Sequence, residues 1–177
     1  MIVKKTKFKG LLIVKQKNNK DKRGNLRETF NDRKLKKKFV FEYCTTSKKN
    51  VLRGFHFQSK FKQSKFVNVI KGKILDVVID LRKNSKTFGK TFKIILSQKN
   101  ALSLYIPAGF AHAYYSYDKE NIIYYKLDNY YAPKYESGII YNDSKLKIKW
   151  PKKKMIISTK DKKLLTFANF KKKFKKI

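Results

Sequence analysis

The chain of 177 residues contains only one cysteine, two histidines and three prolines. With Cys44 alone no intrachain disulfide can form, which fits a reducing compartment, and we expect a cytoplasmic protein. No apolar run approaches the roughly 20 residues of a membrane-spanning helix, and the N-terminal residues lack the apolar core and cleavage site of a secretion signal. The sequence therefore predicts neither secretion nor a membrane partner.

Acidic residues are scarce, since 12 Asp and Glu stand against 46 Lys and Arg and the formal net charge is +34. Such a charge suggests nucleic-acid binding, but only five of the basic residues are arginine, whose planar fork suits base and phosphate recognition. The lysines are also dispersed, as a genome rich in A and T would produce. We expect no specific nucleic-acid partner. A non-enzymatic basic nucleic-acid binder stays open as an alternative, as does a positive field that steers anionic nucleotides.

Glycine-rich phosphate loops of the P-loop or dinucleotide-binding kind are absent. A bound nucleotide must therefore be held by side chains. The two histidines, His56 and His112, lack the His-x-His pair, nearby carboxylate and third histidine of a cupin metal site. We expect no metal and no other cofactor.

Short β-rich runs fill most of the chain, and their spacing is typical of an all-β sandwich or barrel. Hydrophobic residues make up 41% of the chain, enough for a packed core in a single domain over residues 1–177. Lys71-Gly72 predicts a tight hairpin, and Pro107-Ala108-Gly109 predicts a turn. Helical signals are confined to Asp32–Lys37 and to a short helix after Ser158. Residues 170–177 are expected to form a flexible basic tail or a partner contact. The predicted strands are Leu11–Val14, Lys38–Tyr43, Phe66–Ile70, Ile74–Asp80, Thr91–Leu96, Leu102–Ile106, His112–Tyr117 and Ile122–Leu127.

The segment Val51–Gln58 places a rare titratable base, His56, near a fixed cation, Arg53, in an apolar, strand-like stretch. Strand alternation puts Phe55 and Phe57 on one face and His56 on the other, with Arg53 in the preceding turn. A base beside a cation indicates a site for an anionic substrate. Taken alone, a strand histidine is more often a structural, hydrogen-bonded residue.

His112 follows the Pro107–Gly109 turn and opens another strand, a position at the mouth of a barrel. A structural role is equally consistent with the position of this second histidine. From the residues alone, His112 could have either a functional or a structural role.

Ordered segments from about Lys22 to Lys163 resemble the dTDP-4-dehydrorhamnose 3,5-epimerases, a family of nucleotide-sugar enzymes. Asp21–Glu28 is similar to DxRGxxxE, VLRGFHFQ to VLRGLHxQ, and Ile70–Arg82 to VxGxxxDVxVDLR. Ser85–Gly89 is similar to SPTFG, Ile106–His112 to IPxGFAHG, and Tyr141–Pro151 to the family's WxDPxxxIxWP ending. The resemblance implies a cupin or jelly-roll β-barrel, a homodimer, and a cofactor-independent isomerase of dTDP-rhamnose or related deoxysugar biosynthesis for surface polysaccharide.

The resemblance also implies a role for particular residues. His56 matches the general base and Asp161 its carboxylate partner, Lys65 matches the lysine beside the keto oxygen, and Tyr125 matches the tyrosine that returns a proton from the opposite ring face. The positions implied to contact the nucleotide, phosphate, sugar or keto groups are Arg23, Glu28, Arg53, His112 and Lys160. Viewed singly, Tyr125 could simply pack among eleven tyrosines and Lys65 is one lysine of many.

One stretch departs from the family pattern. Where the family has a Gln-x-Asn-x-Ser-like strand with polar side chains that help to bind the nucleotide, this chain has Phe41-Glu42-Tyr43-Cys44-Thr45. Ala113 replaces a glycine and Lys86 a proline. The identities of the nucleotide base and of the sugar therefore stay open.

The expected reaction is epimerisation at C3, C5 or both of a nucleotide-linked 4-keto-6-deoxy sugar. Alternatives are a single-site 3- or 5-epimerase and a sugar 3,4-ketoisomerase, which lacks the opposite-face tyrosine.

Overall fold

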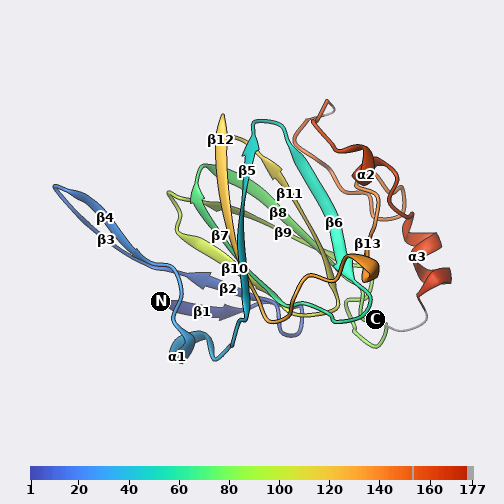
Figure 1. The fold of residues 1–177 in the computed structure, drawn as a ribbon, viewed down its shortest axis with the longest axis horizontal. Coiled ribbons are helices and arrows are strands. Elements are labelled where there is room, and N and C mark those ends of the chain that lie inside the picture. Colours follow the sequence, from blue (N-terminus) through green and yellow to red (C-terminus); the bar gives the residue numbers. More distant parts are fainter. Residues whose placement is uncertain (153, 175–177) are drawn as a thin grey trace.

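The computed structural model describes residues 1–152 and 154–174, and two antiparallel sheets form its body (Figure 1). The six-stranded sheet runs, in spatial order, β1 (Ile2–Lys5), β2 (Leu12–Lys15), β10 (Leu102–Ile106), β7 (Lys65–Lys71), β12 (Glu120–Leu127) and β5 (Phe41–Lys48). The five-stranded sheet runs β13 (Glu136–Gly138), β6 (Leu52–Gln58), β11 (Phe110–Ser116), β8 (Lys73–Asp80) and β9 (Thr91–Ser97). The predicted mainly β, two-layered fold is confirmed.

The main core lies between the two sheets. Strand β12 shows why the sequence folds this way, since Ile123, Tyr125 and Leu127 point into this core while Lys126 on the other face pairs with Glu42. Each fully buried aliphatic side chain contributes roughly 1.5–3 kcal/mol relative to an exposed one. The alternation in β12 thus fixes which of its side chains face the interior.

A second core lies on the outer face of the five-stranded sheet and is covered by the C-terminal segment (Figure 1). Phe55 and Phe57 from β6 pack there, and Phe170 of helix α3 (Phe167–Lys173) is fully buried against them. The N-cap Thr166 accepts a hydrogen bond from the Asn169 amide. The expectation of a flexible tail is therefore wrong for residues 170–174, because the phenylalanines supply a docking face; residues 175–177 lie outside the described residues.

Gly72 does not close a hairpin. Strands β7 and β8 on either side of it belong to different sheets, so the Lys71-Gly72 prediction is wrong. Gly72 has a φ of +84°, and a Cβ there would lie 2.6 Å from Asn121 Oδ1 and the Glu120 carbonyl. Glycine is needed where the chain crosses between layers, and local sequence cannot distinguish such a crossing from a hairpin. The predicted turn at residues 107–109 is present between β10 and β11.

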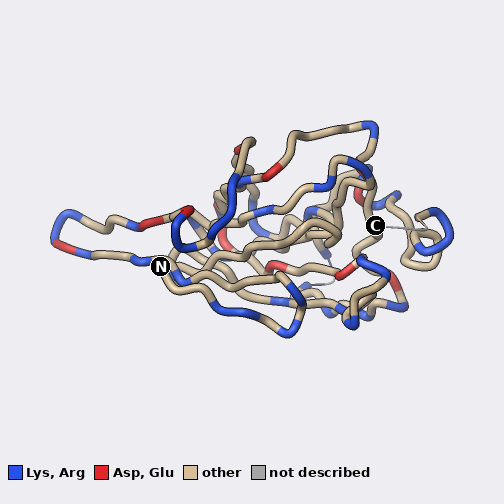
Figure 2. The backbone as a smooth tube through the Cα atoms, turned by 90° about the horizontal axis from the view of Figure 1, so that it is seen from below, with Lys and Arg blue, Asp and Glu red and all other residues tan. Residues whose placement is uncertain are grey.

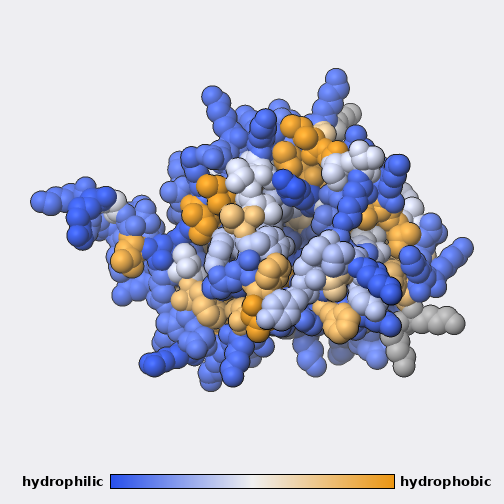
Figure 3. All heavy atoms as spheres, viewed as in Figure 1, coloured by the Kyte–Doolittle hydropathy of each residue, from blue (hydrophilic) through white to orange (hydrophobic). Residues whose placement is uncertain are grey.

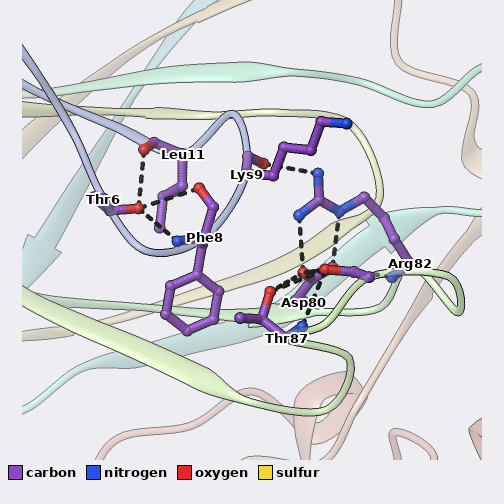
Figure 4. A network of polar contacts seen from close by, with 8 residues as sticks. Thr6, Phe8, Lys9, Leu11, Asp80, Arg82 and Thr87 are labelled. Carbon is purple, nitrogen blue, oxygen red and sulfur yellow. Dashed lines mark hydrogen bonds and ion pairs between the residues drawn. The ribbon is translucent and has the colours of Figure 1, made fainter.

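A buried carboxylate organises the loop after β8 (Figure 4). Asp80 accepts hydrogen bonds from Arg82 Nε and Nη2, both at 2.8 Å, and from Thr87 Oγ1 at 2.6 Å. Arg82 Nη1 donates to the Lys9 carbonyl at 2.8 Å, which ties this loop to the β1–β2 connection. The DLR and SKTFG segments therefore serve the scaffold.

Short helices and a hairpin complete the described parts. Helix α1 covers Asp32–Leu35, α2 covers Thr159–Lys162 and a 3-10 turn covers Pro133–Tyr135. Strands β3 (Lys17–Asp21) and β4 (Gly24–Glu28) form a separate two-stranded ribbon that projects from the body (Figure 1). Among the described residues, no helix has the length and apolar character needed to cross a membrane.

The basic residues are spread over the molecule. Figure 2 shows Lys and Arg along nearly every segment of the chain instead of on one face, and Figure 3 shows a mainly hydrophilic surface with scattered apolar spots. Over residues 1–152 and 154–174, Lys and Arg are thus dispersed and do not form a single basic stripe of the kind that follows a nucleic-acid backbone.

Candidate active site

The two histidines lie side by side on the five-stranded sheet. His56 on β6 and His112 on β11 are direct partners in the antiparallel ladder, so their side chains share the face that looks toward the other sheet. Phe55 and Phe57 point the opposite way into the outer core, which confirms the predicted alternation. The strand pairing thus brings together two residues 56 positions apart in the sequence.

His56 is held by Asp161, as the sequence predicts. His56 Nε2 lies 2.8 Å from Asp161 Oδ1, and the Gly54 amide donates to Asp161 Oδ2 at 2.9 Å. Helix α2 positions the carboxylate, since its N-cap Ser158 accepts a hydrogen bond from the Asp161 amide. Burial raises the pKa of Asp161, but the hydrogen bonds from His56 and Gly54 outweigh it and the net pKa is lowered. The carboxylate is therefore ionised at neutral pH and orients the ring.

His112 has its own carboxylate. His112 Nε2 lies 2.8 Å from Asp76 Oδ2, and both side chains are buried. Asp76 Oδ1 has no hydrogen-bond partner within the described residues. Asp76 was not predicted as a site residue, although a carboxylate inside the apolar run of β8 is itself a signal, because a buried polar group requires a partner.

The facing sheet supplies the other two reactive groups. Lys65 opens β7 and Tyr125 lies on β12, and both line a cavity of about 510 Å³ together with His56, Asp161 and His112. His56 and Tyr125 thus stand on opposite layers of the sandwich. All four residues expected to act in catalysis meet at one cavity.

The environment of Lys65 changes its protonation. Burial lowers the pKa of the ammonium to about 8, although Glu136 and Asp76 act in the opposite direction. Lys65 therefore carries its positive charge at neutral pH and begins to lose it at mildly alkaline pH.

Tyr125 is only 3% exposed, and burial raises its pKa well above the ordinary value. The nearby phenols of Tyr114 and Tyr43 and the Asp76 carboxylate raise it further. The hydroxyl stays protonated at neutral pH and is available as a donor.

A second cavity, of about 350 Å³, adjoins the first and shares Tyr43, His56 and Lys65 with it. Its other walls include Phe41, Tyr131 and Glu136. Burial raises the pKa of Glu136, but hydrogen bonds from Lys160 and Tyr131 outweigh it and the net pKa is lowered. Two connected compartments suit a substrate with two unlike parts.

Both Arg53 and Lys160 line the larger cavity. Arg53 lies within β6 and not in the preceding turn as expected, because β6 already begins at Leu52. Its Nε donates to Ser47 Oγ at 3.1 Å and its Nη2 to the Thr46 carbonyl at 3.3 Å, so β5 holds the guanidinium. Lys160 is paired with Glu136. These cations are available to a phosphate group at the cavity.

Arg23 and Glu28 are not brought to this cavity within one chain. Arg23 lies at the turn of the projecting ribbon, where its side chain is 85% exposed and pairs with Asp21 at 2.7 Å. Glu28 Oε1 accepts a hydrogen bond from Asn31 Nδ2 at 2.7 Å. Neither residue lines either of the two cavities described above.

Sequence reasoning did not single out Tyr43, Tyr131 and Glu136 as lining residues. Tyr43 lies in the stretch that departs from the family pattern, and this departure could have indicated that Tyr43 lines the site. Tyr131 and Glu136 lie in a loop and a three-residue strand, where periodicity gives no indication of direction. Among the residues that the structure describes, no group of three or more His, Cys, Asp and Glu side chains could hold a metal ion.

Comparisons with known proteins indicate one family. The family model described as dTDP-4-dehydrorhamnose 3,5-epimerase matches residues 5–169. A dTDP-4-dehydrorhamnose 3,5-epimerase from Methanothermobacter thermautotrophicus is 41% identical over 165 residues, which cover 89% of each chain.

Solved structures are similar over almost the full length. The dTDP-4-dehydrorhamnose 3,5-epimerase from Bacillus anthracis, solved with TDP and PPi bound, is 35% identical with a TM-score of 0.90, covering 93% of this chain and 98% of that one. The dTDP-6-deoxy-D-glucose-3,5-epimerase from Legionella pneumophila, in complex with dTDP-4-keto-L-rhamnose, is 36% identical with a TM-score of 0.86, covering 90% and 89%.

Proposed function

The chain belongs to the dTDP-4-dehydrorhamnose 3,5-epimerase family, and we propose that it epimerises C3 and C5 of a dTDP-linked 4-keto-6-deoxy sugar without a cofactor. The observation that carries this proposal is the meeting of four groups at one cavity: His56 on one sheet with Asp161 from helix α2, and Lys65 and Tyr125 on the other sheet. The two solved relatives that hold TDP or a dTDP-sugar support the nucleotide class.

The first step removes a proton from a carbon next to the C4 ketone. Such a proton is only weakly acidic, so its removal needs a base that is neutral near pH 7 and held in place. His56 takes the proton at the ring nitrogen that does not face Asp161. Asp161, fixed by the Gly54 amide, stabilises the imidazolium that forms.

The electron pair left on carbon moves onto the C4 oxygen as an enolate. Lys65, with its ammonium at the cavity wall, stabilises this developing charge. A preorganised donor of this kind is typically worth about 3 kcal/mol, or about 100-fold or more in rate. The lowered pKa of Lys65 leaves the cation intact at neutral pH.

The second step returns a proton from the opposite face of the sugar ring. Tyr125 stands on the opposing sheet from His56, and its raised pKa keeps the hydroxyl protonated until the enolate collapses. Solvent then restores the phenol and takes the proton from His56, so the protein is unchanged. Since C3 and C5 both flank the ketone, one base and acid pair can act on each in turn.

Arg53 and Lys160 would contact the diphosphate, and His112 the keto or sugar groups, from their places along the cavity. Arg23 and Glu28 would reach a nucleotide only in a homodimer, in which the projecting ribbon of one copy lies at the cavity of the other. A cytoplasmic location fits a protein that uses nucleotide sugars.

The test is proton NMR in D₂O with dTDP-4-keto-6-deoxyglucose and the purified protein. Loss of both the C3 and C5 proton signals with inversion is the expected result. Loss of one signal would make the protein a single-site epimerase. No exchange with dTDP-, GDP- or CDP-linked keto sugars would overturn the proposal.

A 3,4-ketoisomerase is the nearest competing activity, and it would move the ketone to C3 instead of inverting a centre. Tyr125 on the opposing sheet favours epimerisation. The NMR spectrum distinguishes the two, because a 3-keto product shifts the carbonyl carbon.

A further inference from the structure

Tyr43 contacts the phenol that is proposed to return the proton. The rings of Tyr43 and Tyr125 lie 4.7 Å apart between centroids and are inclined by 21°, a stacked arrangement. The two residues are direct partners in the β5–β12 ladder, so the backbone itself sets this contact. Tyr43 thus covers one face of the Tyr125 ring.

His112 on the facing sheet also contacts Tyr125, with the two ring centroids 6.1 Å apart and the rings inclined by 66°. The phenol therefore has a stacked ring from its own sheet and an edge-on ring from the facing sheet as neighbours. Aromatic pairs of this kind contribute roughly 0.5–1.5 kcal/mol beyond the area that they bury. These two ring contacts limit the freedom of the side chain to turn.

Resting on the proposed function, we infer that Tyr43 is a positioning residue: its ring fixes Tyr125 for proton return to the face opposite His56. Displacement of a reacting group by about 1 Å can cost up to 100-fold in rate, so a ring that removes such freedom matters. Where the family pattern has amide side chains, this strand carries the aromatic ring of Tyr43, which stacks on Tyr125.

Loss of positioning has a specific chemical signature. His56 and Lys65 still remove the proton and stabilise the enolate, so deuterium still enters from solvent. The enolate is then reprotonated on the face from which it lost its proton, and the centre exchanges without inverting. The ratio of the exchange rate to the inversion rate at C3 and C5 therefore shows whether Tyr125 is correctly positioned. A purely structural defect would lower the exchange rate and the inversion rate together.

The experiment compares Tyr43→Leu and Tyr43→Phe with the unmodified protein by NMR in D₂O, using dTDP-4-keto-6-deoxyglucose. Tyr43→Leu is expected to raise the exchange-to-inversion ratio about tenfold while exchange itself changes by less than about threefold. Tyr43→Phe keeps the ring and is expected to stay within about twofold of the unmodified ratio. Tyr124→Leu, on the outer face of the same strand pair, is the matched control and should leave the ratio unchanged.

Two results would overturn the inference. An unchanged ratio in Tyr43→Leu would mean that the ring is not needed, and an equal rise in Tyr43→Phe would assign the effect to the hydroxyl. Should the leucine variant fail a thermal unfolding check by circular dichroism, Tyr43→Ile, β-branched and suited to a strand, takes its place. An unmodified protein that neither exchanges nor inverts the substrate would instead sink the proposed function.

Discussion

The two histidine–aspartate pairs share a contact distance and differ in almost everything else. His56 and His112 each have Nε2 2.8 Å from a carboxylate oxygen. The His56 side chain is 28% exposed and the His112 side chain 5%. Asp76 lies on β8, beside His112 in the same sheet, whereas Asp161 comes from a helix 105 residues away from His56 in sequence.

This difference indicates what each pair can do. An imidazole open to a cavity can exchange protons with a substrate, and its carboxylate serves to orient it. An imidazole enclosed with its carboxylate is held as a fixed part of the wall. The same two side chains therefore suit proton transfer in the more exposed pair and a fixed position in the cavity wall in the buried pair.

The largest effect that tests this comparison is expected for His56→Ala. General base catalysis is typically worth 10²–10⁴-fold, so we expect kcat to fall about 1000-fold and exchange at C3 and C5 to disappear. Asp161 is itself buried but keeps the hydrogen bond from the Gly54 amide, so we expect a smaller loss in the free energy of unfolding than in His112→Ala. Exchange that persisted at near the normal rate would show that another group is the base.

His112→Ala should act more strongly on stability, besides removing the substrate contact proposed for His112. The substitution leaves Asp76 Oδ2 buried without its hydrogen-bond partner, which typically costs about 1–3 kcal/mol. Urea unfolding of the two alanine variants side by side gives the measurement. Equal losses of stability in both would contradict the contrast drawn between the pairs.

Asp161→Asn is expected to lower kcat about 10- to 100-fold, because the amide cannot stabilise the imidazolium. The substitution retains an oxygen for the Gly54 amide, so the fold should remain. Steady-state kinetics with a melting curve separates the two effects. A raised KM with an unchanged kcat would instead indicate that Asp161 acts in substrate binding.

The smallest effect expected is a pH dependence due to Lys65. Its pKa of about 8 means that the ammonium is present below that pH and is lost above it, so kcat/KM should fall about tenfold for each further unit. In Lys65→Arg, whose cation does not titrate in this range, this alkaline limb should vanish whatever the absolute rate. A limb that persisted in the arginine variant would belong to a different group.

Much of the fold could be predicted from the sequence, and the reason is visible in β8 and β12. Both carry strong alternation or a continuous apolar run, and both lie close to their expected bounds. The ribbon of β3 and β4 was not predicted, because its polar residues have no buried face to impose a pattern. The crossing at Gly72 was misassigned because sheet membership depends on pairing far along the chain.

For the site, the order of the motifs predicted that His56, Lys65, Tyr125 and Asp161 would lie together. Hydrophobic periodicity alone could not have predicted this. Chemistry-bearing residues such as Tyr43 and Glu136 remained hidden, since their importance arises from which cavity they line. The placement of Arg23 shows the converse limit, because a residue expected at the site stands away from it in a single chain.

Helix α2 brings Asp161 to the His56 strand from outside the sheet. The strands of the sheet that carries His56 end in sequence at Gly138, while the carboxylate follows later in the chain. The packing of this short helix against β6 therefore sets two contacts at once, because Asp161 holds the His56 ring and Lys160 pairs with Glu136. A substitution that loosened helix α2 would thus disturb the imidazole without any change in the sheet itself.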